Sequence, residues 1–207
     1  MIAYKFLAAG AVGPFSGFRW TPGRWVEAAR EQEGFGIHAC RPADLSWWIH
    51  AELWRVELEG PVRERATQIE ARRGRLVDRI EAWNAQMRAE FGLDCVFQAR
   101  DVAVAALRTL RHDDLAERLA AARTLDDLVR ATSSLQPPPG FAGEMFGYAA
   151  DAGGAYTARA NPAEASFMVS VATAAARGHP SGFDEERWRE SRWLAQRLGI
   201  PPVESGR

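Results

Sequence analysis

Alternation of apolar and polar side chains marks residues 53 to 58 as a half-buried strand. In the run LWRVEL every second residue is large and apolar, namely Trp54, Val56 and Leu58. Side chains of a strand point to opposite faces in turn, so this set is predicted to face the core and Glu57 the other side. Gly60-Pro61 follows and predicts the end of the strand.

Shorter apolar runs separated by turn residues fill the chain before this strand. Glycines and prolines punctuate residues 10 to 23 and indicate turns. The runs between them predict a small, hairpin-rich sheet, with strands at Tyr4 to Leu7, Gly17 to Trp20, Trp25 to Ala28 and Gly36 to Cys40. Pro42 is then predicted to open a helical turn that carries Trp47 and Trp48.

A helical period replaces the alternation further along the chain. Residues 64 to 72 fit either a strand or the start of a helix. From Arg75 to Phe91 a stripe that includes Leu76 and Trp83 predicts a helix, with Gly92 as its C-terminal stop. Further helices are predicted near 99–111, 113–122, 125–134, 141–152, 162–177 and 183–198.

These elements predict an α+β fold in which a small, mainly antiparallel N-terminal sheet packs against a larger helical region. We expect residues 1–62 to form an aromatic-rich β-type module that holds five of the eight tryptophans. Residues 63–135 are predicted to be helical, with one further strand near 64–72 as an alternative. The stiff segment QPPPG at 136–140 then leads to C-terminal helices within 136–207.

Composition narrows the classes of partner. The 207 residues hold 26 basic and 27 acidic side chains, and a net charge of -1 gives no electrostatic reason to bind nucleic acid or an anionic membrane. The chain shows no basic leader and no run of about 18 apolar residues, so we expect a cytoplasmic, non-membrane protein. Its alanine- and arginine-rich composition is typical of bacteria with GC-rich genomes.

Motifs for common cofactors are missing from the sequence. The two cysteines, Cys40 and Cys95, have no zinc-ligand spacing and are too few for a disulfide scaffold. Neither GxGxxG nor GxxxxGK[ST] occurs. We therefore expect no metal and no bound cofactor.

The N-terminal segments YKFL, GPFSGFRW, PGRWVEA, GIHACRPADL and LWRVELEG occur in a specific order. In that order they resemble an uncharacterised family of actinobacteria and phages, whose members share a G-[FI]-H-A-C-x-x-x-D-L core followed by a [LY]-W-x-V-E strand. The C-terminal FDEERWRESRWLAQRLGI, with YAADA before it, is similar to the tail of actinobacterial members. No activity is established for that family, so the resemblance implies no catalytic residues.

Residues 36 to 40, GIHAC, also resemble a strand of the ADP-ribosyltransferase fold, which has the form G-[FIL]-[YH]-x-[TC]. Glu57 and Glu59 form an E-x-E, as in that fold. The spacing from the strand to these glutamates is shorter than the pattern of that fold. This resemblance would imply a transferase.

His38 is the first candidate for catalysis, because an imidazole can exchange protons near pH 7. On a strand it shares a face with Cys40, which we take as a candidate ligand contact. The alternative is a core histidine beside a small buried thiol. Glu57 is the second catalytic candidate, as a carboxylate facing a groove; the alternative is a solvated polar face paired with Arg55.

The aromatic surplus suggests a ligand pocket. Trp47 and Trp48 point about 100° apart on a helix, so one of them can line a pocket and stack on a planar ligand. Arg19 is a candidate for a cation–π contact or a ligand contact there. Simple core packing of these rings is the alternative.

Trp193 lies off the apolar arc of the last predicted helix and is a candidate for contact with a partner. Two classes of function follow. The first is a small-molecule binding protein or enzyme, with a pocket for a planar, nucleotide-like ligand at the junction of sheet and helices. The second is a non-catalytic interaction or regulatory module that forms a homodimer or binds a protein through its C-terminal helices. A tailoring enzyme of secondary metabolism is a third alternative.

Overall fold

The computed structural model describes residues 1–28 and 36–201. It confirms the α+β fold, with an antiparallel sheet in the N-terminal part and helices after it. The chain divides into two compact units, Met1–Met87 with Trp188–Arg207, and Arg88–Arg187.

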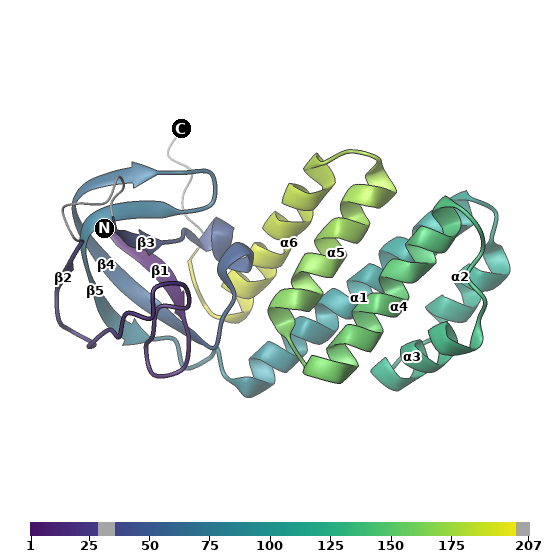
Figure 1. The fold of residues 1–207 in the computed structure, drawn as a ribbon, viewed down its shortest axis with the longest axis horizontal. Helices are drawn as coiled ribbons and strands as arrows, with labels where there is room; N and C mark the ends of the chain where they lie inside the picture. The colour runs from purple at the N-terminus through teal and green to yellow at the C-terminus, as the bar shows by residue number, and fades with distance from the viewer. Residues whose placement is uncertain (29–35, 202–207) are drawn as a thin grey trace. The chain divides into compact units, whose positions relative to one another are not determined.

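The first unit contains a five-stranded sheet, in which β4 and β5 form a long hairpin (Figure 1). The strand order is β1-β4-β5-β2, and β3 also pairs with β5. All pairs are antiparallel. The strands are β1 (Ile2–Leu7), β2 (Val26–Glu27), β3 (Ile37–Ala39), β4 (Glu52–Glu64) and β5 (Ile69–Arg79). The predicted strand at Gly17 to Trp20 is reduced to a single bridge between Val12 and Arg19.

A single backbone bridge connects the segment after β3 to the first strand of the sheet, β1. Tyr4 of β1 and Cys40 exchange two backbone hydrogen bonds, of 2.9 and 2.7 Å. Because Cys40 directly follows β3, this bridge connects the edge beyond β5 back to β1. The strands therefore enclose an apolar interior, as in a small barrel.

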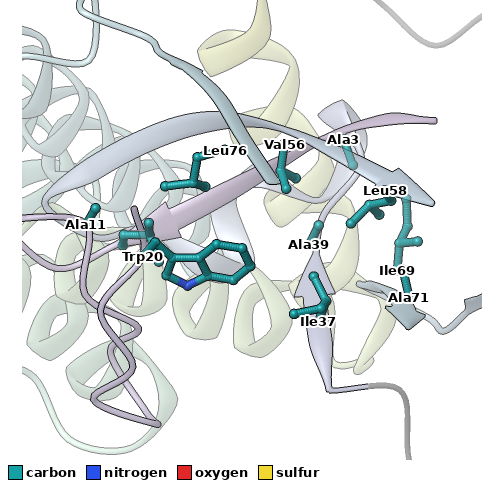
Figure 2. Packing of buried hydrophobic residues seen from close by; sticks show 11 residues of the cluster. Ala3, Ala11, Trp20, Ile37, Ala39, Val56, Leu58, Ile69, Ala71 and Leu76 are labelled. Atoms are coloured by element: carbon teal, nitrogen blue, oxygen red, sulfur yellow. The ribbon is translucent and has the colours of Figure 1, made fainter. Parts of the chain in front are cut away.

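Side chains from several strands fill that interior. Figure 2 shows Ala3 of β1, Val56 of β4 and Leu76 of β5 in one cluster with Trp20. Ile37 and Ala39 contribute from β3. Val56 and Leu58 are buried, as the alternation predicted, and Trp54 is partly buried against the same cluster.

The hairpin of β4 and β5 corrects the predicted end of the first of these strands. Gly60-Pro61 does not end the strand, since β4 continues to Glu64. The register shifts between Glu59 and Val62, and Gly60 has a φ of 85°. A bulge of this kind is a place where a proline is tolerated inside a sheet.

The segment from 69 to 79 is a strand, so the helix predicted from Arg75 to Phe91 was wrong over its first part. Leu76 is fully buried in the interior cluster as a residue of β5. Helix α1 begins only at Ala85 and runs to Thr109. It passes through Gly92, which was predicted to be its stop.

A short 3-10 helix, η1 (Pro42–Trp48), follows β3, as Pro42 predicted. Arg41 Nε donates to the Asp44 carboxylate at 2.5 Å and holds the first turn. The Ser46 backbone N–H donates to Ser191 Oγ at 3.1 Å. The rings of Phe6 and Trp83 meet edge to face with centroids 5.6 Å apart, so the face of β1 opposite the interior is also packed.

The remaining helices begin and end within two residues of the predicted positions, except that α4 extends seven residues beyond its predicted end at 152. They are α2 (Asp113–Ala120), α3 (Leu125–Ser134), α4 (Phe141–Arg159), α5 (Pro162–Arg177) and α6 (Ser181–Arg197). Thr124 caps α3 in a capping box with Asp127. In the second unit α4 packs against α3 and α5 (Figure 1). None of the helices in residues 1–28 and 36–201 has the length and apolar character needed to cross a membrane.

Candidate functional site

Lys5 stands on the inner face of the sheet. Its neighbours at alternate positions of β1, Ala3 and Leu7, both belong to the interior cluster, so the Lys5 side chain starts from the same face. Lys5 is the only lysine in the sequence, and the other 25 of the 26 basic residues are arginine. The chain thus places its single primary side-chain amine on the inner face of the sheet, where Lys5 is half-buried.

The Lys5 amine lies where β1 and β3 separate. The two strands are bridged at Tyr4 and Cys40, and an antiparallel ladder would next use the carbonyl of His38. That carbonyl instead accepts a hydrogen bond from Lys5 Nζ. The amine also lies 5.5 Å from the centre of the Trp20 ring. Lys5 therefore spans the opening between the strands.

Burial lowers the pKa of Lys5 from 10.5 to about 8. A charged ammonium is poorly solvated among apolar groups, so the neutral amine is favoured. Lys5 forms no ion pair within the described part of the chain, whose carboxylates pair with arginines instead. Burial also raises the pKa of the nearby Cys40 thiol, with Asp44 adding to the effect, so this thiol stays protonated at neutral pH.

A pocket of about 620 Å³ opens beside Lys5. Aromatic rings make up much of its wall, and it lies wholly within the first unit. Its lining residues include the large residues Phe15, Phe18, Trp20, Ile37 and Trp48 and the polar residues Lys5, Ser16, Glu27, His38 and Gln68. The pocket thus combines an apolar wall with a single lysine.

The loop after β1, which forms one side of the pocket, is held in place by Glu52. Its carboxylate accepts from the backbone N–H groups of Gly10 and Ala11, at 3.0 and 3.1 Å, and from Trp54 Nε1 at 3.0 Å. Burial alone would raise the pKa of Glu52. These hydrogen bonds and Arg79 outweigh burial and hold that pKa below its ordinary value. Ala11 keeps a positive φ of 57° in this turn.

Two aromatic contacts shape the outer part of the pocket. Phe15, at the tip of the loop, is 89% exposed and meets Trp48 edge to face at 6.5 Å. Trp48 is fixed by a 2.7 Å hydrogen bond from Nε1 to the carbonyl of Thr67. Phe18 meets the buried Trp20 edge to face at 5.6 Å. An exposed ring at the rim beside a fixed one offers a surface for stacking.

Three of the residues predicted from sequence line this pocket, namely His38, Cys40 and Trp48. His38 offers its backbone carbonyl to Lys5, while its exposed side chain starts from the face opposite Ile37 and Ala39. Glu70 of β5 is the residue paired with His38 across the sheet. Cys40 is almost completely buried. His38 and Cys40 therefore occupy different environments.

The three other residues predicted for the ligand site lie outside the pocket lining. Glu57 forms an ion pair with Arg75 at 2.7 Å. Arg19 is exposed and bridges to Val12 through its backbone. Trp47 is half-buried in η1. None of these three is among the residues that line the pocket.

Trp193, the candidate for partner contact, is partly buried, and the Arg197 guanidinium lies 5.1 Å from its ring. Trp188 on the same helix is more exposed, at 50%. A partner at this helix stays a prediction.

Sequence reasoning missed Lys5 itself, along with Phe15 and the role of Trp20 in the pocket. A signal was present, because YKFL places a lysine between apolar residues in a chain that otherwise uses arginine. Its environment could not be read from the chain, since Lys5 acquires its neighbours from β3 and from the loop at Trp20.

No three His, Cys, Asp or Glu side chains in the described residues gather as a metal site would require. Comparison of the chain with protein-family models, with curated proteins and with solved structures found no match. The resemblances noted in the sequence therefore stay predictions.

Proposed function

We propose that the first unit binds a small organic molecule that has a flat apolar body and one polar head group. The observation that carries this proposal is the pocket of about 620 Å³ with aromatic walls and the Lys5 amine among its lining residues. The body lies against Trp20, Phe15 and Trp48, and the head group meets Lys5.

Three features support this proposal. The volume falls within the range of roughly 300–1,000 Å³ that is usual for small-molecule pockets. An apolar wall with a few polar groups gives both affinity and orientation. The hydrogen bonds of Glu52 fix the loop in advance, which lowers the entropy that binding must overcome.

The charges at the pocket favour a ligand with one head group. A planar, nucleotide-like body would suit the aromatic wall. A polyphosphate, however, would meet one cationic side chain, Lys5, and one carboxylate, Glu27, among the residues that line the pocket. We therefore favour a ligand with at most one small polar or anionic group.

The test uses 2-naphthylmethanol as a neutral probe with a flat body, and Phe15→Ala as the variant. Because Phe15 is 89% exposed, its loss should leave stability unchanged. Losing one ring contact of about 0.5–1.5 kcal/mol should weaken binding by roughly two- to tenfold. Isothermal titration calorimetry measures the affinity.

Phe141→Ala is the matched control, since Phe141 is also an exposed phenylalanine, at 42%, and belongs to the second unit. Its affinity for the probe should equal that of the unaltered chain. Equal losses in both variants, or no binding to the unaltered chain, would contradict the proposal.

A further inference from the structure

We propose that Lys5 forms an imine with a carbonyl compound, an aldehyde or ketone whose apolar body occupies the pocket beside Trp20. This inference rests on the proposed function and specifies the head group of the ligand. Its basis is the position of the amine among the residues that line the pocket, next to the Trp20 ring and outside any ion pair within the described part of the chain.

The choice of residue type supports a nucleophile over a simple cation. An anion site would be served by arginine, which binds carboxylates through two parallel hydrogen bonds. Arginine occupies each of the other 25 basic positions of this chain. Lysine differs in that it can lose its proton near neutral pH and then attack a carbonyl group.

The surroundings of Lys5 keep the amine reactive. With a pKa of about 8, a substantial fraction of the amine is neutral near pH 7 to 8. The His38 carbonyl accepts from Nζ and orients it. The other ionisable residues at the pocket are Tyr4, Glu27, Cys40 and His38 itself, and none forms an ion pair with Lys5 within the described part of the chain.

The reaction balances without any further reagent. The Nζ lone pair attacks the carbonyl carbon, and a C–N bond forms as the C=O π electrons move to oxygen. A proton passes from nitrogen to that oxygen and gives a carbinolamine. The hydroxyl then leaves as water, taking up the last amine proton, and the nitrogen lone pair completes the C=N bond. One water is released, and nothing is oxidised or reduced.

The experiment incubates the folded chain with 2-naphthaldehyde and sodium cyanoborohydride at neutral pH and locates the reduced adduct by mass spectrometry. One adduct per chain is expected, on Lys5. Lys5→Arg, which keeps the charge, and Lys5→Met should both lose it. Modification confined to the N-terminal amine would overturn the inference.

The rate provides a second readout. Lys5 should be modified on the order of tenfold faster in the folded chain than in urea, because the neutral fraction rises as its pKa falls toward 8. An equal or slower rate in the folded chain would overturn the inference, because the folded environment would then make the Lys5 amine no more reactive than that of a solvated lysine.

Binding of 2-naphthylmethanol separates this inference from the proposed function. This alcohol has the same flat body and no carbonyl group. If the alcohol binds and the aldehyde gives no Lys5 adduct, imine formation at Lys5 is contradicted and ligand binding in the pocket is supported. If neither compound binds, both proposals are contradicted.

Discussion

At the scale of the residue, burying the Lys5 ammonium costs free energy of hydration, and the other side chains of β1 carry no such cost. An ammonium among apolar groups loses hydration, and no carboxylate among the described residues compensates for it. One carbonyl and one ring face replace part of the lost water, from His38 and Trp20. A position that costs stability and adjoins a pocket is typical of a functional site.

This cost predicts a pH dependence of stability. The pKa of Lys5 is about 8 in the folded chain and ordinarily 10.5. Between these values the unfolded chain binds more protons, so the contribution of Lys5 to the free energy of unfolding rises with pH over this window. Below pH 8 the full penalty applies. Lys5→Met removes the penalty and the slope.

Urea denaturation between pH 7 and 10.5 measures this effect. The stability of the unaltered chain relative to Lys5→Met should rise by about 1–3 kcal/mol across the window. The tyrosines titrate in both proteins and cancel in the difference, which keeps only the titration of Lys5 and its charge coupling to Cys40. Two curves that stay parallel would show that the amine is solvated.

At the scale of the element, close packing of two helices explains why the glycine predicted to end a helix lies inside one. Gly92 was predicted to end a helix, yet it lies inside α1 because the Tyr156 ring of α4 packs onto it. A Cβ at Gly92 would come within 2.3 to 2.6 Å of that ring. The Tyr156 hydroxyl also donates to the carbonyl of Ala89 at 3.1 Å. Such a contact cannot be read from the local sequence.

Gly92→Ala should therefore destabilise the second unit. Overpacking at such a site costs about 1–3 kcal/mol, which exceeds the gain of up to about 1 kcal/mol from replacing a helical glycine with alanine. Thermal or urea denaturation measures the change.

Gly147→Ala in α4 is the matched control. Apart from its chain neighbours and the backbone of its own helix, no atom lies within 4 Å of a Cβ at Gly147, so this variant should be stabilised by about 0.5–1 kcal/mol. Similar changes in both variants would contradict the packing of Tyr156 on Gly92.

Local signals predicted the starts of the helices from 113 onward to within two residues, because the helical period is clear there and Thr124 caps α3. The β4–β5 hairpin was predicted only in part. Gly60-Pro61 usually ends a strand, but a bulge absorbs it here. Pairing with β4 also gives Leu76 a strand partner, Val56, which overrides the helical spacing of its segment.

At the scale of the molecule, the sequence predicted the fold class and part of the pocket wall. Trp48, Cys40 and His38 were singled out and line the pocket. Lys5 was not, because its place depends on the closure of the sheet between Tyr4 and Cys40 and on the loop held by Glu52. Both are long-range contacts that residue types alone do not specify.

The central claim is that the single lysine is a desolvated amine at the wall of a ligand pocket. Selective ¹³C labelling of lysine tests it most directly, since the one lysine of the chain gives one Cε signal in NMR spectra. We expect an inflection near pH 8 instead of 10.5, and a shift of that signal when 2-naphthylmethanol is added. A Lys5 signal that titrates near 10.5 and does not respond to the alcohol would contradict it.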